Sequence, residues 1–234
     1  MTEILNANTM ETDRKWIVVR IDGKLAAVST DYRLLASISA NLAGYELNHE
    51  KAQRRRKPRK SKPGKSCIYG NISAESVGIE EIWRLRKETR WDDLMLFGTE
   101  FQKKVWRKLW ELTHPEAGAE TEAEAKTGTE PTGQDQTSLI CYSDFAELCQ
   151  NRAGVRAVAH AIGLNPISVI IPCHLVIPKE SIDKIRDIHK KAEATIFKGD
   201  DLCINSILSD SSIDFGEYAL GRKLKRELIL RELA

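Results

Sequence analysis

Apolar and polar residues alternate in the first part of the chain with the period of β-strands. Residues 15–29 (KWIVVRIDGKLAAVS) hold two β-rich runs joined at Asp22-Gly23, a dipeptide typical of a two-residue hairpin turn. The same pattern analysis predicts a helix over 33–43, a short strand over 67–72 and a helix over 80–87. Together these elements predict a small α/β unit that ends near Phe97.

Helical spacing of apolar residues dominates the second part of the chain. A helix is predicted over 99–112, with Phe101, Val105, Leu109 and Leu112 on one face. Two short helices follow across a tight turn: 142–149, with Phe145, Leu148 and Cys149 facing inward, and 155–162. Such a pair is typical of the helix-turn-helix, whose second helix enters a DNA groove. Because most helix pairs simply pack together, the pattern alone does not decide for DNA binding.

The densest apolar run, 167–171 (ISVII), predicts a buried strand that stops at Pro172. Cys173 and His174 follow directly, and a cysteine beside a histidine is a candidate activated thiol. The alternative is that Cys173 is a small core residue, as free cysteines usually are. Consecutive strand residues point to opposite faces, so His174 contacts Cys173 only if the chain turns there or a water bridges them.

Composition narrows the class of protein. The chain has 234 residues, of which 41% are hydrophobic and 30% charged, as in soluble globular proteins. No apolar run approaches the roughly 18 to 20 residues that span a bilayer. The N-terminal residues lack the order of a secretory signal, and five cysteines do not form a disulfide framework in a chain of this size. We therefore expect a cytoplasmic protein without contact to a membrane.

Charge is unevenly distributed although the net charge is only +2. Nine of the fifteen residues in 51–65 are Lys or Arg, whereas 115–136 holds six acidic residues and one basic residue. Neither stretch has apolar periodicity, so both are predicted to be exposed loops. The basic run is either a solvated linker or an arm that contacts phosphates.

Four segments together resemble the O6-alkylguanine-DNA alkyltransferases, also called methylated-DNA–protein-cysteine methyltransferases. They are FGTEFQKKVW (97–106), CYSDFAEL (141–148), RAVAHAIGLNP (156–166) and VIIPCHLV (169–176). The resemblance covers 97 to the C-terminus apart from inserts near 115–136 and 178–213, the second with an amphipathic helix over 182–197. Residues 14–96 match only loosely, in the position of the family's N-terminal domain.

This resemblance implies an α+β fold in two parts. A flexible N-terminus (1–13) precedes a small α/β domain (14–96) that includes the basic loop 51–65. The second domain (97–234) is then mainly helical and winged-helix-like, with a helix-turn-helix and a Pro-Cys-His active-site segment.

The resemblance also implies a role for each site residue. Cys173 resembles the thiol that accepts the alkyl group from guanine O6, and His174 the base that takes the thiol proton through a water. Glu232 resembles the glutamate that holds the histidine, and Tyr142 the tyrosine that protonates the leaving guanine and contacts DNA. The other implied positions are Arg156, which fills the space of a flipped nucleotide, Ala157 at the DNA surface, the hinge residue Asn165, and Val176, Tyr218 and Ala219 around the guanine.

The implied partner is double-stranded DNA that contains O6-alkylguanine, and the implied protein is a monomer that acts once without metal or cofactor. Simpler readings stay open: Tyr142 as a packing residue, Arg156 as a solvent-facing charge, and Glu232 as a surface partner of nearby cations. Leu175 stands where most relatives have arginine. This departure and the inserts keep two other classes open, a protein that flags alkylguanine without accepting the group and, less favoured, a thiol hydrolase.

Overall fold

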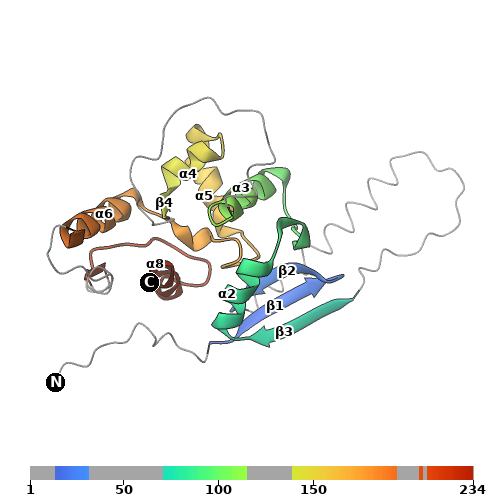
Figure 1. Ribbon diagram of the computed structural model, residues 1–234. Coiled ribbons are helices and arrows are strands. Elements are labelled where there is room, and N and C mark those ends of the chain that lie inside the picture. Colours follow the sequence, from blue (N-terminus) through green and yellow to red (C-terminus); the bar gives the residue numbers. More distant parts are fainter. Residues whose placement is uncertain (1–13, 32–70, 115–138, 194–205, 208–209, 234) are drawn as a thin grey trace, which may run out of the picture. The chain divides into compact units, whose positions relative to one another are not determined.

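A computed structural model describes residues 14–31, 71–114, 139–193, 206–207 and 210–233 (Figure 1). Helices and strands are mixed in these residues, which confirms the fold class at that level. The chain divides into two compact units, 1–99 with 166–170 and 100–165 with 171–234. The predicted helix 33–43, the basic run 51–65 and the acidic insert 115–136 lie outside the described residues.

The first unit is built on the predicted hairpin, which is confirmed. Strands β1 (Trp16–Ile21) and β2 (Lys24–Ser29) pair antiparallel. Asp22 and Gly23 between them have φ values of 52° and 80°, the left-handed conformation that a tight hairpin turn of this type requires. Both strands are mostly buried.

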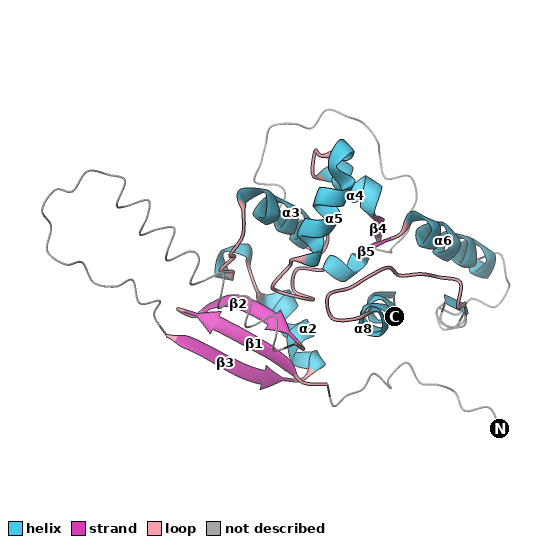
Figure 2. Ribbon diagram, turned by 180° about the vertical axis from the view of Figure 1, so that it is seen from behind, coloured by secondary structure: helices cyan, strands magenta, loops and turns pink. Residues whose placement is uncertain are grey.

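A third strand, β3 (Ile72–Val77), pairs antiparallel with β1 and gives the strand order β2-β1-β3. The predicted strand 67–72 overlaps β3 only at Ile72, and 67–70 lie outside the described residues. The rest of β3 was not predicted, since the segment ISAESV is largely polar and its side chains are mostly exposed. Helix α2 (Ile79–Glu88), predicted over 80–87, covers one face of the sheet (Figure 2).

The second unit contains four predicted helices, α3 (Glu100–Glu111), α4 (Tyr142–Leu148), α5 (Val155–Gly163) and α6 (Lys179–Glu193). It also contains α8 (Arg222–Leu233) near the C-terminus. Both α3 and α4 pack against α5, and Trp106 Nε1 in α3 donates to the carbonyl of Ala161 in α5 at 2.8 Å. Strands β4 (Ile140–Cys141) and β5 (Val176–Ile177) form a short parallel pair.

Two apolar side chains that were predicted to face inward are exposed. Phe101 in α3 is 37% exposed and Leu148 in α4 is 49% exposed. In α3 the buried face is centred on Trp106 and Leu109, and Phe101 lies roughly 110° away around the helix. In α4 the buried pair Phe145 and Ala146 turns Leu148 outward in the same way.

The run 167–171 is buried throughout but is not a strand, so that prediction is wrong. Only its start pairs with a strand, β2: Val28 N–H donates to Pro166 O, and Ser168 N–H donates to Val28 O, both at 3.0 Å. The chain then turns at Val169, whose φ of 71° is unusual for a β-branched residue. Burial made the sequence look like a strand, whereas the backbone makes a turn.

No helix among the described residues combines the length and apolar character that crossing a membrane requires.

Candidate active site

Cys173 lies on a turn and not on a strand. Pro172 precedes a 3₁₀ turn formed by Cys173–Leu175, and Leu175 N–H donates to Pro172 O at 3.1 Å. The chain therefore turns at the cysteine–histidine pair, which is one of the two conditions under which these neighbours can act together. Cys173 is 6% exposed, and His174 and Leu175 are fully buried.

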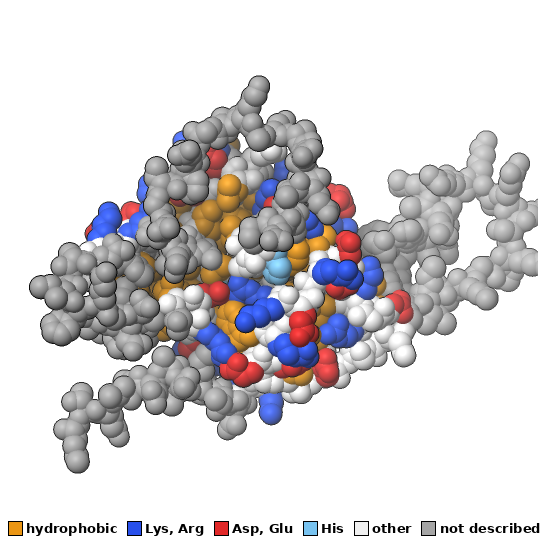
Figure 3. Space-filling model, viewed as in Figure 1, with side chains coloured by type: hydrophobic (Ala, Val, Ile, Leu, Met, Phe, Trp, Pro, Cys, Tyr) orange, Lys and Arg blue, Asp and Glu red, His pale blue; other side chains and the backbone are white. Residues whose placement is uncertain are grey.

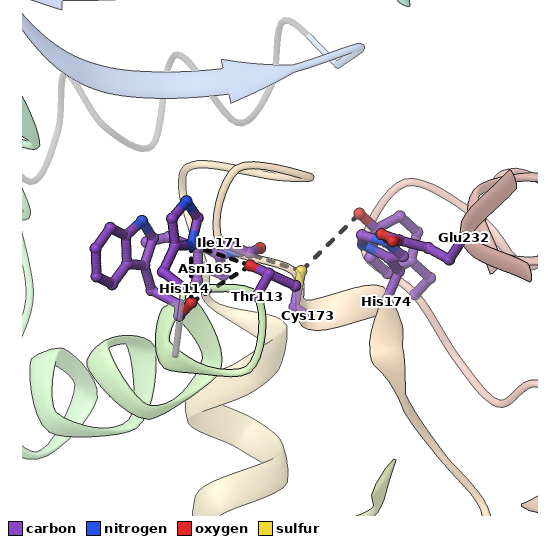
Figure 4. Close-up of polar contacts among 9 residues, drawn as sticks. Thr113, His114, Asn165, Ile171, Cys173, His174 and Glu232 are labelled. Atoms are coloured by element: carbon purple, nitrogen blue, oxygen red, sulfur yellow. Dashed lines mark hydrogen bonds and ion pairs between the residues drawn. The ribbon is translucent and has the colours of Figure 1, made fainter. Parts of the chain in front are cut away.

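Asn165 ties the end of α5 to the cysteine. Its Nδ2 group donates to the Ile171 carbonyl at 2.8 Å and contacts the Cys173 Sγ at 3.1 Å (Figure 4). The carbonyl can only accept a hydrogen bond, so the amide NH₂ must face both atoms. Asn165 itself is buried. This side chain thus fixes the turn 166–171 and places a polar group against the sulfur.

His174 and Glu232 form an ion-pairing contact between the turn and the last turn of α8. His174 Nε2 lies 2.8 Å from Glu232 Oε1. A carboxylate accepts, so Nε2–H is the donor and the neutral ring carries its lone pair on Nδ1. A carboxylate in this place also stabilises the imidazolium that forms when the ring takes a proton. The structure therefore places Glu232 against the buried histidine.

Tyr218 approaches the sulfur from the segment before α8. The Cys173 thiol donates to the Tyr218 hydroxyl over 3.9 Å. Burial raises the pKa of the Cys173 thiol, while the Asn165 amide, the Tyr218 hydroxyl and the charge of Lys225 each lower it by a smaller amount. The thiol is therefore mostly protonated at neutral pH and needs a base to become a nucleophile.

Lys225 is a site residue that the sequence reasoning missed. It is 1% exposed, and its Nζ donates to the Val176 carbonyl at 2.7 Å, to the Glu217 carbonyl at 3.3 Å and to the Tyr142 hydroxyl at 3.4 Å. Burial lowers the pKa of Lys225 to about 8. The sequence did hold a signal for a buried lysine. Positions 224, 225, 228 and 229 form the buried face of α8, and Lys225 occupies one of these inward positions.

Tyr142 is the first residue of α4 and is half-buried. Burial raises the pKa of its phenol, and the nearby Cys173 acts in the same direction. The phenol therefore keeps its proton at neutral pH and is able to donate it. Lys225 Nζ also lies 5.7 Å from the centre of the Tyr142 ring.

Arg156 and Ala157 are exposed on α5, the second helix of the pair. The turn between α4 and α5 depends on Gly154, since a Cβ there would lie 2.4 Å from the Asn151 side chain. Figure 3 shows apolar side chains reaching the surface in the region of α4 and α5, where Leu148 and Leu164 are exposed. Ala219 is exposed beside Tyr218, and the Val176 carbonyl already accepts from Lys225.

The described residues hold no group of three or more His, Cys, Asp and Glu side chains arranged to bind a metal ion.

Replacement of Lys225 by methionine is expected to slow the reaction of Cys173 with iodoacetamide about tenfold at pH 7, because loss of the cation raises the pKa of the thiol. Lys225 itself loses its proton as the pH rises through about 8, so the difference between the two proteins shrinks above that pH. Mass spectrometry of the Cys173 peptide measures the rate. Lys223→Met, an exposed position on the same helix, is the control; equal rates for Lys225→Met and the unchanged protein at pH 7 would contradict the role of the charge.

Helices α4 and α5 and the cysteine turn lie within the region that a comparison with family models matches. The family model described as "6-O-methylguanine DNA methyltransferase, DNA binding domain" matches residues 135–194. A protein of Acanthamoeba polyphaga mimivirus named "Probable methylated-DNA--protein-cysteine methyltransferase" is 39% identical over 89 residues, which are 38% of this chain and 45% of that protein.

A second relative, the methylated-DNA–protein-cysteine methyltransferase of Methanosarcina mazei, is 38% identical over 80 residues, 34% of this chain and 37% of its own length. Over the matched region the chain is thus similar to the methylated-DNA–protein-cysteine methyltransferases, which confirms the resemblance that its motifs predicted. The matches span less than half the length of either relative. The crystal structure of O6-methylguanine-DNA methyltransferase from Pyrococcus kodakaraensis aligns with 94% of this chain and 92% of its own, at 18% identity and a TM-score of 0.42.

Proposed function

We propose that this protein repairs DNA by moving an alkyl group from O6 of guanine to its own Cys173. The observation that carries the proposal is the Cys173–His174 turn with Glu232 behind the histidine at 2.8 Å. This is the order of groups that makes a thiol nucleophilic: a thiol, a base and a carboxylate that stabilises the protonated base. The domain match and the relatives' names support the same reaction.

The step balances without an added reactant. His174, acting through a water, takes the thiol proton, and the thiolate attacks the alkyl carbon. The new S–C bond forms as the C–O6 bond breaks, and the electron pair passes to guanine, which Tyr142 protonates. The product is an uncharged thioether on Cys173 that has no route back. Each molecule therefore acts once, and the residues require no metal or organic cofactor.

The target carbon is shielded in duplex DNA, so the nucleotide must leave the stack before it reacts. Unstacking costs a few kcal/mol. We propose that α4 and α5 bind double-stranded DNA, that exposed Arg156 fills the vacated space, and that Ala157 lies at the DNA surface. Asn165, Val176, Tyr218 and Ala219 would surround the flipped guanine.

We also propose the wider assignment that accompanies this function. The chain would be a cytoplasmic, DNA-associated monomer, with an α/β domain over 14–96 and a winged-helix-like catalytic domain over 97–234. The two units and the α4–α5 pair support this arrangement.

Duplex DNA that carries labelled methyl groups on guanine O6 tests the proposal directly. We expect the label to move from DNA to protein. Label that stays in DNA while protein remains bound would indicate a protein that flags the lesion, and hydrolysis of an ester substrate by Cys173 would indicate a hydrolase. Either result would overturn the proposal.

Arg156→Ala is expected to lower the rate of transfer from duplex about tenfold, while the rate with free O6-methylguanine base changes less than twofold. The reason is that a flipped nucleotide leaves a gap in the base stack of the duplex, whereas the free base leaves none. Only the duplex substrate therefore gains from a side chain that fills the gap. Rates of label transfer from the two substrates give the comparison. Arg186→Ala, which removes an exposed arginine on α6, serves as the control. An equal loss with both substrates would count against insertion.

A further inference from the structure

Along the sequence, helix α6 lies between the active-site turn and the segment that carries Tyr218. It is part of the same core as the site. Its Ile182 and Ile185 pack in one apolar cluster with the strand pair, the segment before α8 and α8 itself, through Cys141, Ile177, Ile207, Ile213, Phe215 and Ile229. The helix is therefore packed into the second unit through Ile182, Ile185 and the partly buried Ile188.

A polar face of α6 is bound to the segment 210–218, here called the rim segment. The buried Ser181 hydroxyl donates to the Asp214 carbonyl at 2.5 Å. One turn further along, Lys184 Nζ donates to the Ser212 carbonyl at 2.7 Å and to its hydroxyl at 3.0 Å. Residues three apart lie on one helix face, so the two contacts follow one line. Figures 1 and 2 show the segment running beside α6 toward α8.

The start of α6 makes a third contact at Gly216. This residue has a φ of 79°, and a Cβ on it would lie 3.2 Å from the Pro178 ring. The Asp214 carboxylate accepts from the Gly216 N–H at 2.9 Å, which closes the turn. The rim segment thus runs antiparallel to the first two turns of α6.

These contacts end two residues before Tyr218, whose hydroxyl lies 3.9 Å from the Cys173 sulfur. On the other side of the segment, Lys225 holds the Glu217 carbonyl at 3.3 Å. The backbone just before Tyr218 is therefore held by hydrogen bonds from α6 on one side and from Lys225 on the other.

We propose that Ser181 and Lys184 are positioning residues: through the rim segment they hold the Tyr218 hydroxyl against the Cys173 thiol and so set the reactivity of that thiol. This inference rests on the proposed function in taking Cys173 as the acceptor. Its effect on the thiol itself is measurable without DNA.

The pH dependence of Cys173 alkylation by iodoacetamide tests the inference, with mass spectrometry of the Cys173 peptide as the readout. The groups that act on the sulfur are Asn165, Tyr218, Lys225 and Tyr142; His174 follows Cys173 in the turn and has Glu232 against its ring. Ser181→Ala is expected to move the profile to higher pH and to slow alkylation about threefold at pH 7, because the Tyr218 hydrogen bond lowers the pKa of the thiol.

A double-variant cycle separates positioning from general stability. If Ser181 acts through Tyr218, Ser181→Ala adds nothing in a Tyr218→Phe background. Ser181→Thr, which keeps the hydroxyl, restores the unchanged profile. Lys184→Met shifts the profile in the same direction and tests the line of contacts even if Ser181→Ala folds poorly, whereas Lys190→Met, at an exposed position on α6, leaves it unchanged.

Two results would overturn the inference. One is an equal slowing by Ser181→Ala with and without the Tyr218 hydroxyl, and the other is an unchanged profile in a protein that is merely less stable. The alkylation of Cys173 by iodoacetamide needs no DNA. If the unchanged protein fails to transfer methyl groups, the proposed function is rejected, but the effect of Ser181 on the thiol can still be measured.

Discussion

Cys173→Ala abolishes transfer of a labelled methyl group from duplex DNA, with a loss of at least about 10³-fold, while affinity for DNA changes less than twofold. The variant lacks the atom that forms the new bond. The Cys173 side chain is nearly buried, so its removal leaves the exposed surface of α5 unaltered. Label transfer and DNA titration measure the two quantities.

Cys149→Ala is the matched control for this experiment. Cys149 is also buried, and burial raises the pKa of its thiol to about 11, so it is almost wholly protonated at neutral pH. Its replacement leaves transfer intact. If Cys173→Ala loses DNA binding together with transfer, Cys173 is a structural residue and the proposed reaction is wrong.

Glu232→Gln is expected to slow transfer about 100-fold. The amide oxygen still accepts the hydrogen bond from His174 Nε2, so the ring keeps its orientation. The negative charge is lost, however, and with it the stabilisation of the imidazolium that forms when His174 takes the thiol proton. Single-turnover rates of methyl transfer measure the effect at saturating DNA.

Glu227→Gln, five residues earlier on α8, is the control for charge on this helix and leaves the rate unchanged. A Glu232→Gln protein that transfers methyl at the rate of the unchanged protein would mean that the 2.8 Å contact only joins α8 to the turn.

Local patterns in the sequence predicted those helices and strands that are determined by residues close together in the chain. The β1–β2 hairpin follows from Asp22-Gly23 between alternating strands, and α2 to α5 follow from apolar residues at helical spacing. The amphipathic helix in the second insert is also confirmed as α6, over 179–193, whereas 194–197 lie outside the described residues.

Features set by distant contacts could not be predicted in this way. The run 167–171 looks like a strand because it is apolar, but the Asn165 amide binds the Ile171 carbonyl and closes a turn instead. Strand β3 is polar and pairs only because β1 offers a free edge. Lys225 looked like one of many surface cations, and only the fold shows that it binds the Val176 carbonyl in the interior.

The family resemblance predicted more residues of the candidate site than the pattern of apolar and polar residues did. Local reasoning gave Cys173 and His174 as a possible pair but left open a plain core cysteine. The contact between Glu232 and His174 joins residues 58 positions apart, and no periodicity in the sequence indicates it. The structure brings these three residues and Tyr218 together, and it leaves Arg156 and Ala157 on the exposed face of α5.

The most direct measurement is the intact mass of the protein after reaction with an excess of duplex that contains O6-methylguanine, followed by peptide mapping. We predict a single added methyl group per molecule, located on Cys173, with a plateau at one equivalent however long the reaction runs. An unmodified protein after loss of methyl from DNA, a methyl group on another residue, or more than one demethylation per molecule would contradict the account.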